Sequence, residues 1–325
     1  MKNLIVGLGV TLLLLTNAVA FDGKELAKRS YRGHKVEKIA WSVPDMKDVP
    51  NNQYGELVKY GRELIVNTSK YIGPEVDDIS MRYAGNNNQC QNCHLEAGTK
   101  AYSAPFVGTY GEFPQYRPRE DGIGTLTARI NGCMLRSMNG YPLPAEGKEM
   151  KAMQAYMHWL SQGIPVGGAS KIPGRGLAKI DRKMIKAQAA DPVKGKVVYD
   201  LQCASCHGIN GEGVKKAGKA NGYEFPALWG SDDTYNKGAG MYRVLKAADF
   251  IKNNMPLGAT HEAPILSDEE AYNVAAYMND DAHYRPEKIN RNSDFPDATV
   301  KAPDVYRVGV EGKEHKFGPY GKIIK

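Results

Sequence analysis

The feature that most constrains the fold of this chain is a short motif that occurs twice. NQCQNCHL begins at Asn88 and LQCASCHG begins at Leu201, so both copies contain C-x-x-C-H and together use four of the five cysteines. Two thiols at this spacing, followed directly by an imidazole, are typical of c-type haem attachment: the thiols bond to the haem and the histidine binds its iron. The pattern predicts one haem held by Cys90, Cys93 and His94, and a second haem held by Cys203, Cys206 and His207.

The first twenty residues have the pattern of an export signal. Lys2 precedes an apolar run from Leu4 to Leu15, and Ala18-Val19-Ala20 matches an A-x-A cleavage pattern. The run is too short to span a bilayer, so we expect cleavage after Ala20, with an uncleaved anchor as the alternative. We therefore expect a periplasmic protein with no membrane span after signal removal. Because c-type haems are attached after export, the signal also favours haem over a zinc site or a redox cysteine pair.

The length and the duplicated motif indicate two domains. About 305 residues remain after signal removal, which is enough for two domains that each bury a core. We expect a mainly α fold with two c-type cytochrome domains in tandem, each with one covalently attached haem, joined by a Gly/Pro-rich linker and followed by an extended C-terminal tail. The expected boundaries are a signal peptide at 1–20, an N-terminal domain at 21–162, a linker at 163–190, a C-terminal domain at 191–284 and the tail at 285–325.

The two halves share more than the haem motif. The segment 61–65 aligns with 195–199, and Asp191 followed by proline predicts the capped start of a helix that leads into the second motif. Ser267 and Glu270 predict a capping box at the start of a closing helix. The closing helices carry Ala-Tyr-Met at 155–157 and 276–278, and methionines at helical spacing in the first of them predict core packing.

The loop between each haem motif and its closing helix contains a candidate sixth ligand for iron. Met255 is followed by proline and lies 22 residues before Tyr277, which predicts thioether ligation of the second haem. Counting back from Tyr156 gives Met134 at 22 residues and Cys133 at 23. Met134 predicts an ordinary His/Met haem, and Cys133 predicts a His/thiolate haem of lower potential, because an anionic sulfur stabilises ferric iron. The other four cysteines are used by the motifs, so Cys133 has no disulfide partner within the chain, and an inert buried thiol is the third alternative for it.

The charge of the chain excludes one class of function. The formal net charge is +7, and loss of Lys2 with the signal reduces it by one. Lysine and arginine are spread along the chain and form no basic stripe. We therefore expect no nucleic-acid partner and only a weak attraction for anions.

Several segments resemble one family, the di-haem c-type thiosulfate dehydrogenases, which also act as tetrathionate reductases. The resemblance covers most of the mature chain, and the arginine and cysteine block between the haem motifs is its most specific part. The matching segments are MRYAGNNNQCQNCHLEAGT (81–99), PFVGTYGEFPQYRPRE (105–120), RINGCMLRSMNG (129–140), VYDLQCASCHG (198–208), PALWG (226–230), GAGMYR (238–243) and NNMPLG (253–258).

The resemblance implies roles for individual residues. Cys133 occupies the position of the distal ligand of the catalytic haem, and Arg119, Arg129 and Ser137 match residues around the substrate. Guanidinium groups suit the sulfonate oxygens of dianionic thiosulfate and tetrathionate. Some relatives have an alternative lysine ligand directly before the distal methionine. This chain has Asn254 there and Lys252 two residues earlier, so plain His/Met ligation by His207 and Met255 is favoured at the second haem.

The resemblance implies an enzyme that interconverts two thiosulfates and tetrathionate plus two electrons at the His/Cys haem. The second haem would relay electrons to an external carrier, expected to be a small cytochrome c, and a transient thiosulfonate adduct on Cys133 fits this chemistry. One alternative is a di-haem electron carrier without substrate, in which Met134 would be a ligand. Another is a sulfur-oxidising cytochrome that conjugates thiosulfate to a carrier protein, whereas a peroxidase is disfavoured because the segment facing the first haem offers no histidine.

Overall fold

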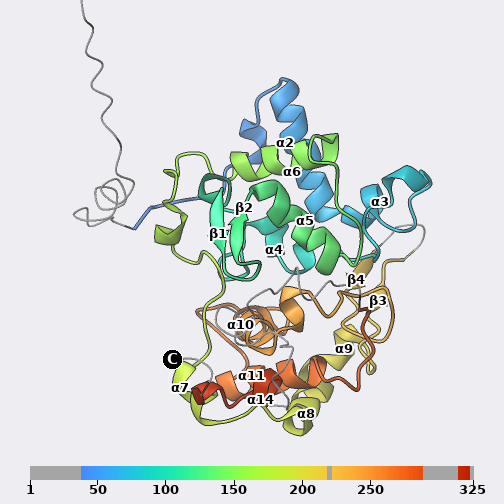
Figure 1. The fold of residues 1–325 in the computed structure, drawn as a ribbon, viewed down its shortest axis with the longest axis vertical. Helices are drawn as coiled ribbons and strands as arrows, with labels where there is room; N and C mark the ends of the chain where they lie inside the picture. The colour runs from blue at the N-terminus through green and yellow to red at the C-terminus, as the bar shows by residue number, and fades with distance from the viewer. Residues whose placement is uncertain (1–37, 218–221, 288–313, 323–325) are drawn as a thin grey trace, which may run out of the picture. The chain divides into compact units, whose positions relative to one another are not determined.

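The computed structural model describes residues 38–217, 222–287 and 314–322, and its elements are mostly short helices joined by loops (Figure 1). The expected signal peptide at 1–20 lies outside the described residues. Within the described ranges, the strands form two short antiparallel hairpins, so the expectation of a mainly α fold is confirmed. No helix in these ranges is both long enough and apolar enough to cross a membrane.

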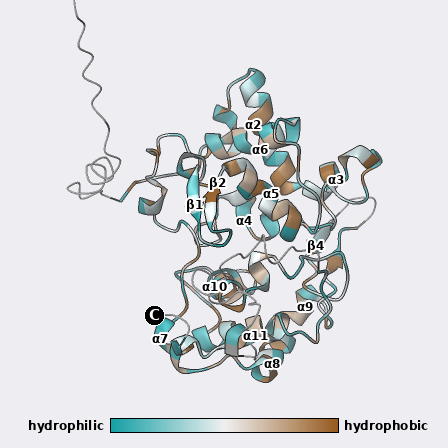
Figure 2. Ribbon diagram, in the orientation of Figure 1, coloured by the Kyte–Doolittle hydropathy of each residue, from teal (hydrophilic) through white to brown (hydrophobic). Residues whose placement is uncertain are grey.

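The first half, residues 38–162, packs its first long helix against its last. Asn52 caps α2 by accepting a hydrogen bond from the Gly55 backbone amide, and α2 packs against α6 (Figure 1). Figure 2 shows hydrophobic and hydrophilic residues interspersed along these helices, as one-sided burial requires. The elements are η1 (Met46–Asp48), α2 (Gln53–Val66), α3 (Thr68–Ile72), η2 (Ile79–Met81), η3 (Cys90–Asn92), α4 (Leu95–Gly98), η4 (Tyr110–Glu112), β1 (Gln115–Arg117), β2 (Gly122–Gly124), α5 (Leu126–Arg136) and α6 (Lys148–Trp159).

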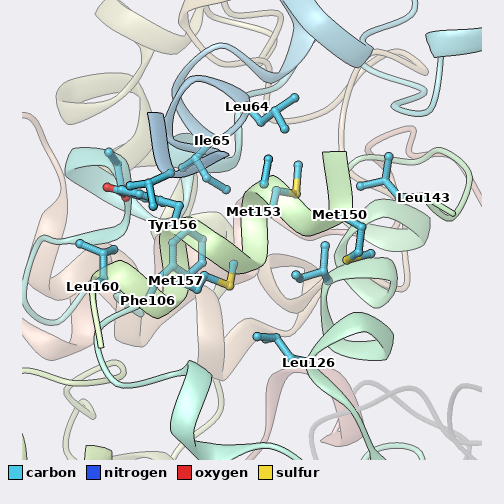
Figure 3. Close-up of a cluster of buried hydrophobic side chains, with 14 of the residues drawn as sticks. Leu64, Ile65, Phe106, Leu126, Leu143, Met150, Met153, Tyr156, Met157 and Leu160 are labelled. Carbon is cyan, nitrogen blue, oxygen red and sulfur yellow. Dashed lines mark hydrogen bonds between the residues drawn. The ribbon is translucent and has the colours of Figure 1, made fainter. Parts of the chain in front are cut away.

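The methionines of α6 form core, as their helical spacing predicted. Met150, Met153 and Met157 lie in the main buried cluster of the first half (Figure 3). Leu64 and Ile65 of α2 belong to the same cluster. Unbranched thioether side chains fill such an irregular interface well, so these methionines are explained by packing.

The second half, residues 191–287, repeats this arrangement. Asp191 caps α8 through the amides of Val193 and Lys194, and Ser267 and Glu270 form the expected capping box at the start of α11. Both predicted caps are confirmed. The elements are α8 (Pro192–Gln202), α9 (Ala204–His207), β3 (Val214–Lys215), β4 (Tyr223–Phe225), η6 (Gly240–Tyr242), α10 (Val244–Asn254) and α11 (Asp268–Met278).

One pair of glycines shows how closely the halves correspond. A Cβ atom added at Gly61 of α2 would lie 2.0 Å from the Ala152 carbonyl oxygen of α6, and one added at Gly195 of α8 would lie 2.0 Å from the Asn273 carbonyl oxygen of α11. Glycine is therefore required where the first helix of each half crosses the closing helix. The segments 61–65 and 195–199 therefore correspond in the structure as well as in the sequence.

The segments outside the two halves contain more helix than the sequence indicated. The expected linker 163–190 contains η5 (Ala169–Lys171) and α7 (Arg182–Ala187), and the described part of the tail contains α14 (Glu314–Phe317) and η7 (Tyr320–Lys322). The expectation of an extended tail is therefore wrong for residues 314–322. Phe317 and Tyr320 are buried in the core of the second half, and this anchoring stabilises turns too short to show helical periodicity.

Hydrogen bonds between buried backbone and side-chain groups join the two halves. The Asn86 amide donates to the Thr234 carbonyl at 2.9 Å. The Asn236 amide donates to the Leu135 carbonyl at 2.8 Å, and both asparagines are fully buried. These bonds fix the first haem motif and the end of α5 against the loop that precedes α10.

Candidate functional site

Both C-x-x-C-H motifs line one continuous cavity of about 510 Å³. This volume lies within the range of roughly 300–1,000 Å³ typical of ligand and cofactor sites. Apolar side chains from α5, α6, α10 and α11 form much of the wall. Within the described residues no three His, Cys, Asp or Glu side chains come together as a metal cluster.

The two motif histidines are oriented in the same way. The Nδ1 atom of His94 lies 2.6 Å from the Ala104 carbonyl oxygen, and that of His207 lies 2.8 Å from the Pro226 carbonyl oxygen. A carbonyl only accepts hydrogen bonds, so Nδ1 carries the proton in each ring and Nε2 keeps its lone pair. This is the usual arrangement of a histidine that binds a metal through Nε2.

Burial sets the protonation of the motif side chains. Burial lowers the pKa of His207, which favours the neutral ring that a metal requires. Burial raises the pKa of the Cys90 thiol to about 11 and that of Cys93 and Cys203 to about 12. Neutral thiols in an apolar cavity beside an oriented imidazole fit a covalently attached haem, whose thioether bonds leave the sulfurs uncharged.

Cys133 differs from these motif cysteines. Burial by itself would raise the pKa of its thiol, but nearby positive charge, above all that of Arg129, outweighs burial and lowers the pKa to about 5. Arg129 donates from Nη1 to the Cys133 sulfur at 2.9 Å. Cys133 is therefore a thiolate at neutral pH, in the same cavity as His94.

Helix α5 brings Arg129, Cys133 and Ser137 together on one face. Thr125 caps the helix, and residues four apart lie on one helical face. Cys133 and Ser137 line the cavity, while Arg129 reaches the thiolate from the preceding turn. Met134 also lines the cavity but belongs to the buried cluster of the first half.

Sequence reasoning missed three charged residues near Cys133. Arg117 in β1 donates to Glu120 at 2.7 Å, and the guanidinium of Arg136 lies 3.4 Å from the same carboxylate oxygen. Arg136 also contributes to the lowered pKa of Cys133. The spacing of Arg136 three residues after Cys133 could have indicated this proximity, whereas the position of Arg117 depends on the β1–β2 hairpin.

Arg119 does not line the cavity. Its guanidinium donates to the Gly238 carbonyl in the second half. Arg119 therefore connects β1 and its following turn to the loop before α10, whereas Arg129 contacts Cys133.

The end of α10 carries the methionine expected at the second haem. Met255 follows the last helical residue in an extended conformation and lines the cavity together with His207. Lys252 points elsewhere: its ammonium donates to the Leu266 carbonyl at 2.7 Å and pairs with Asp268 at 3.0 Å.

Comparisons with known proteins agree with this architecture. Residues 81–166 match the family model described as SoxA/TsdA, cytochrome c domain, and residues 192–280 match the model described as cytochrome c. The chain therefore contains two cytochrome c domains in tandem, which bind haem c.

Similar proteins cover most of the chain. The thiosulfate dehydrogenase of Stutzerimonas stutzeri (strain A1501) is 45% identical over 266 residues, which are 82% of this chain and 79% of that protein. The thiosulfate dehydrogenase of Thiomonas intermedia (strain K12) is 38% identical over 247 residues, which are 76% and 72% of the two chains.

A solved structure shows the same fold. The "as isolated" form of thiosulfate dehydrogenase (TsdBA) from Marichromatium purpuratum matches with a TM-score of 0.65 and 34% identity, over 74% of this chain and 48% of that chain. The present chain thus spans about half the length of that solved chain. Two tandem cytochrome c domains and this extent of similarity place the chain in the thiosulfate dehydrogenase family.

Proposed function

We propose that this protein is an oxidoreductase that joins two thiosulfates into tetrathionate with release of two electrons, or runs the reverse reaction. The observation that carries the proposal is the Cys133 thiolate, held by Arg129 in the cavity that His94 lines. A passive electron carrier has no use for a stabilised thiolate, which is a nucleophile. The names of the relatives agree with this substrate.

The same proposal assigns the iron ligands. His94 and Cys133 would bind the iron of the first haem, and His207 and Met255 that of the second. Cys90 and Cys93, and likewise Cys203 and Cys206, would form the thioether bonds. When bound, each haem supplies a one-electron acceptor, so two haems can take the two electrons that one turnover releases.

The chemistry at Cys133 can be written so that charge and electrons balance. The Cys133 thiolate and the terminal sulfur of one thiosulfate form an S–S bond with loss of two electrons, leaving a singly negative thiosulfonate adduct. The terminal sulfur of a second thiosulfate then attacks the adjacent sulfur of the adduct. The bond to Cys133 breaks, tetrathionate leaves as a dianion, and the thiolate is restored. Cys133 would therefore be the attacking thiolate in the first step and the leaving group in the second, and it would not be an iron ligand in either.

The arginines around Cys133 would offset repulsion between the reacting anions. The first thiosulfate dianion must approach the Cys133 thiolate, and the second must approach the singly negative adduct. Arg129 lies against the thiolate sulfur at 2.9 Å. Arg117 and Arg136 add positive charge nearby, held in place by Glu120. In a partly buried site such fixed cations are worth more than in water, because little solvent screens them.

We infer that the enzyme is periplasmic and passes its electrons to an external carrier, a small cytochrome c being the expected partner. The N-terminal export pattern supports the location. Met255 supports the direction of flow, because thioether ligation raises the potential of the second haem above that of a thiolate-ligated first haem.

The test is to mix the oxidised holoprotein with thiosulfate, with ferricyanide as acceptor, and to measure haem reduction and tetrathionate. Turnover without any partner chain is the expected result, and it excludes both a passive carrier and a cytochrome that needs a carrier protein. If neither reduction nor product appears, the reverse assay with tetrathionate and a reduced viologen decides. Failure in both directions contradicts the proposal.

A further inference from the structure

The segment 102–104 is strained where it contacts both halves. Tyr102 and Ala104 have φ values of 58° and 53°, a left-handed conformation that non-glycine residues rarely adopt. Ser103 between them is fully buried. Strain of this kind persists only where the surroundings fix it, and it gathers at functional sites.

The carbonyl groups of these two strained residues serve different haem sites. The Ala104 carbonyl accepts the hydrogen bond that orients His94. The Tyr102 carbonyl accepts a hydrogen bond from the side-chain amide of Asn254 at 3.1 Å. The backbone amides of Tyr102 and Ala104 donate to the carbonyls of Gly174 and Gly176, so the segment is pinned from the other side as well.

Asn254 directly precedes Met255, at the last position of α10. Its side chain is 2% exposed, and the same amide also donates to the Phe250 carbonyl at 3.0 Å. Both partners are acceptors, so the orientation of the amide is determined. Asn254 thus joins the end of its own helix to the strained segment of the first half.

A second contact supports this junction. The ring of His261 stacks on Tyr102 with centroids 3.8 Å apart, and its Nδ1 atom lies 2.7 Å from the side-chain oxygen of Asn253. Asn254, just before Met255, is therefore held by the carbonyl of Tyr102, and His261, after Met255 in the chain, is held by the Tyr102 ring.

We propose that Asn254 is a positioning residue for Met255, and that the strained segment 102–104 sets the geometry of one axial ligand at each haem. The inference rests on the proposed function only through the assignment of His94 and Met255 as iron ligands. The end of α10 requires only the bond from Asn254 to the Phe250 carbonyl, so the positioning role accounts for the additional bond to the Tyr102 carbonyl. The buried amide of Asn254 bonds to the first half and so fixes the point at which the chain passes from α10 to the extended Met255.

Loss of the amide should weaken methionine binding first in the ferric state, where the iron–thioether bond is weaker. The Asn254→Ala holoprotein should therefore lose part of its methionine-to-iron charge-transfer absorption when oxidised, and the midpoint potential of the second haem should fall. Once methionine is largely free in the ferric state, each further tenfold loss of its binding lowers that potential by about 59 mV.

The experiment compares wild type, Asn254→Ala and Asn236→Ala by ferric absorption and spectroelectrochemical titration, after mass measurement confirms two haems per chain. Asn236→Ala is the matched control, because it removes a buried asparagine that also joins the halves, but at the end of α5. We expect the potential and the band to change only in Asn254→Ala. Asn254→Asp, which keeps the shape but replaces the donor by an acceptor, provides the same comparison if the alanine variant does not fold.

Two results overturn the inference. An unchanged band and potential in Asn254→Ala means that the amide does not position Met255. An equal change in Asn236→Ala means that any loosening of the junction suffices. A wild-type protein that lacks the methionine band contradicts the ligand assignment instead, and thiosulfate turnover tests the proposed reaction separately.

Discussion

At the scale of single residues, the environment of the cysteines separates their roles. The spacing in the sequence left Cys133 and Met134 equally placed, because both lie in the same helical turn. The structure supplies the difference: Arg129 contacts the sulfur of Cys133, and Met134 packs in the core. The i, i+4 spacing of Arg129 and Cys133 could have indicated their contact, but the burial that opposes the lowered pKa depends on the tertiary packing of the cavity.

Replacement of Cys133 by alanine tests this distinction. We expect two attached haems and a fall in kcat/KM for thiosulfate of at least about a thousandfold, because the reacting sulfur is lost. Met134→Leu is the control, since the two side chains have similar volume and Met134 is 1% exposed. If Met134→Leu changes the ligand spectrum of the first haem while Cys133→Ala does not, Met134 is the ligand and the carrier interpretation is favoured. Haem content by mass and steady-state kinetics give the answer.

Arg129→Lys should separate charge from geometry. Lysine keeps the positive charge but replaces a planar fork by a single ammonium group, so sulfonate binding should weaken. We expect KM for thiosulfate to rise about tenfold, equal to about 1.4 kcal/mol, with two haems still attached. Arg62→Lys, at a side chain 40% exposed on α2, is the control and should leave KM unchanged. An unchanged KM in Arg129→Lys would remove Arg129 from substrate binding.

At the scale of elements, capping residues in the sequence predicted where two helices start. The short hairpin and turns depend on long-range packing and were not predicted. The caps at Asp191 and Ser267 depend on residues within three positions of one another, so the sequence contains them in full. The β1–β2 hairpin and the turns of 314–322 are too short for a periodic pattern, and tertiary contacts stabilise them. For the same reason the group formed by Arg117, Glu120 and Arg136 was missed.

The capping box of α11 predicts a pH-dependent contribution to stability. Hydrogen bonds from the backbone and side chain of Ser267 hold the pKa of Glu270 below its ordinary value of 4.5. A lowered pKa stabilises the fold above the ordinary value, and this contribution is lost as pH falls through the lowered pKa. Glu270→Ala should therefore cost about 1 kcal/mol of unfolding free energy at neutral pH, and this difference from wild type should shrink in acid.

Denaturant titrations of the holoprotein at several pH values would measure this contribution. Glu269→Ala is the matched control, because it removes a charge from the same helical turn but only an exposed ion pair with Lys194. It should change stability by less than about 0.5 kcal/mol. A constant difference between Glu270→Ala and wild type down to pH 3 would contradict the role of the ionised carboxylate.

At the scale of the whole molecule, the junction between the halves was not foreseen. Asn86 and Thr234 are 148 positions apart, and Leu135 and Asn236 are 101 apart. Nothing in either local sequence indicates these partners, although the duplicated haem motif did predict two similar halves. The tandem arrangement was therefore predictable, and the way in which the halves join was not.

Asn236→Ala should loosen this junction. It removes buried hydrogen bonds to Leu135 and Asn139 and should cost about 1–3 kcal/mol. We expect calorimetry of the holoprotein to resolve two transitions where wild type shows one, because fewer contacts would couple the halves. Asn131→Ala removes two hydrogen bonds to Leu143 within the first half. It should lower stability without dividing the transition, and a divided transition in both variants would contradict the special role of the junction.

The cavity shared by the two C-x-x-C-H motifs has a consequence for biogenesis. The cavity of about 510 Å³ is lined largely by apolar side chains, and apolar surface left in contact with water costs free energy that a bound haem would recover. Haem would therefore complete the core of both halves, and we expect the chain to fold fully only after both groups are attached. In a cell that makes the polypeptide faster than it supplies haem, the surplus should be degraded by proteases rather than stored as an apoprotein awaiting its cofactor.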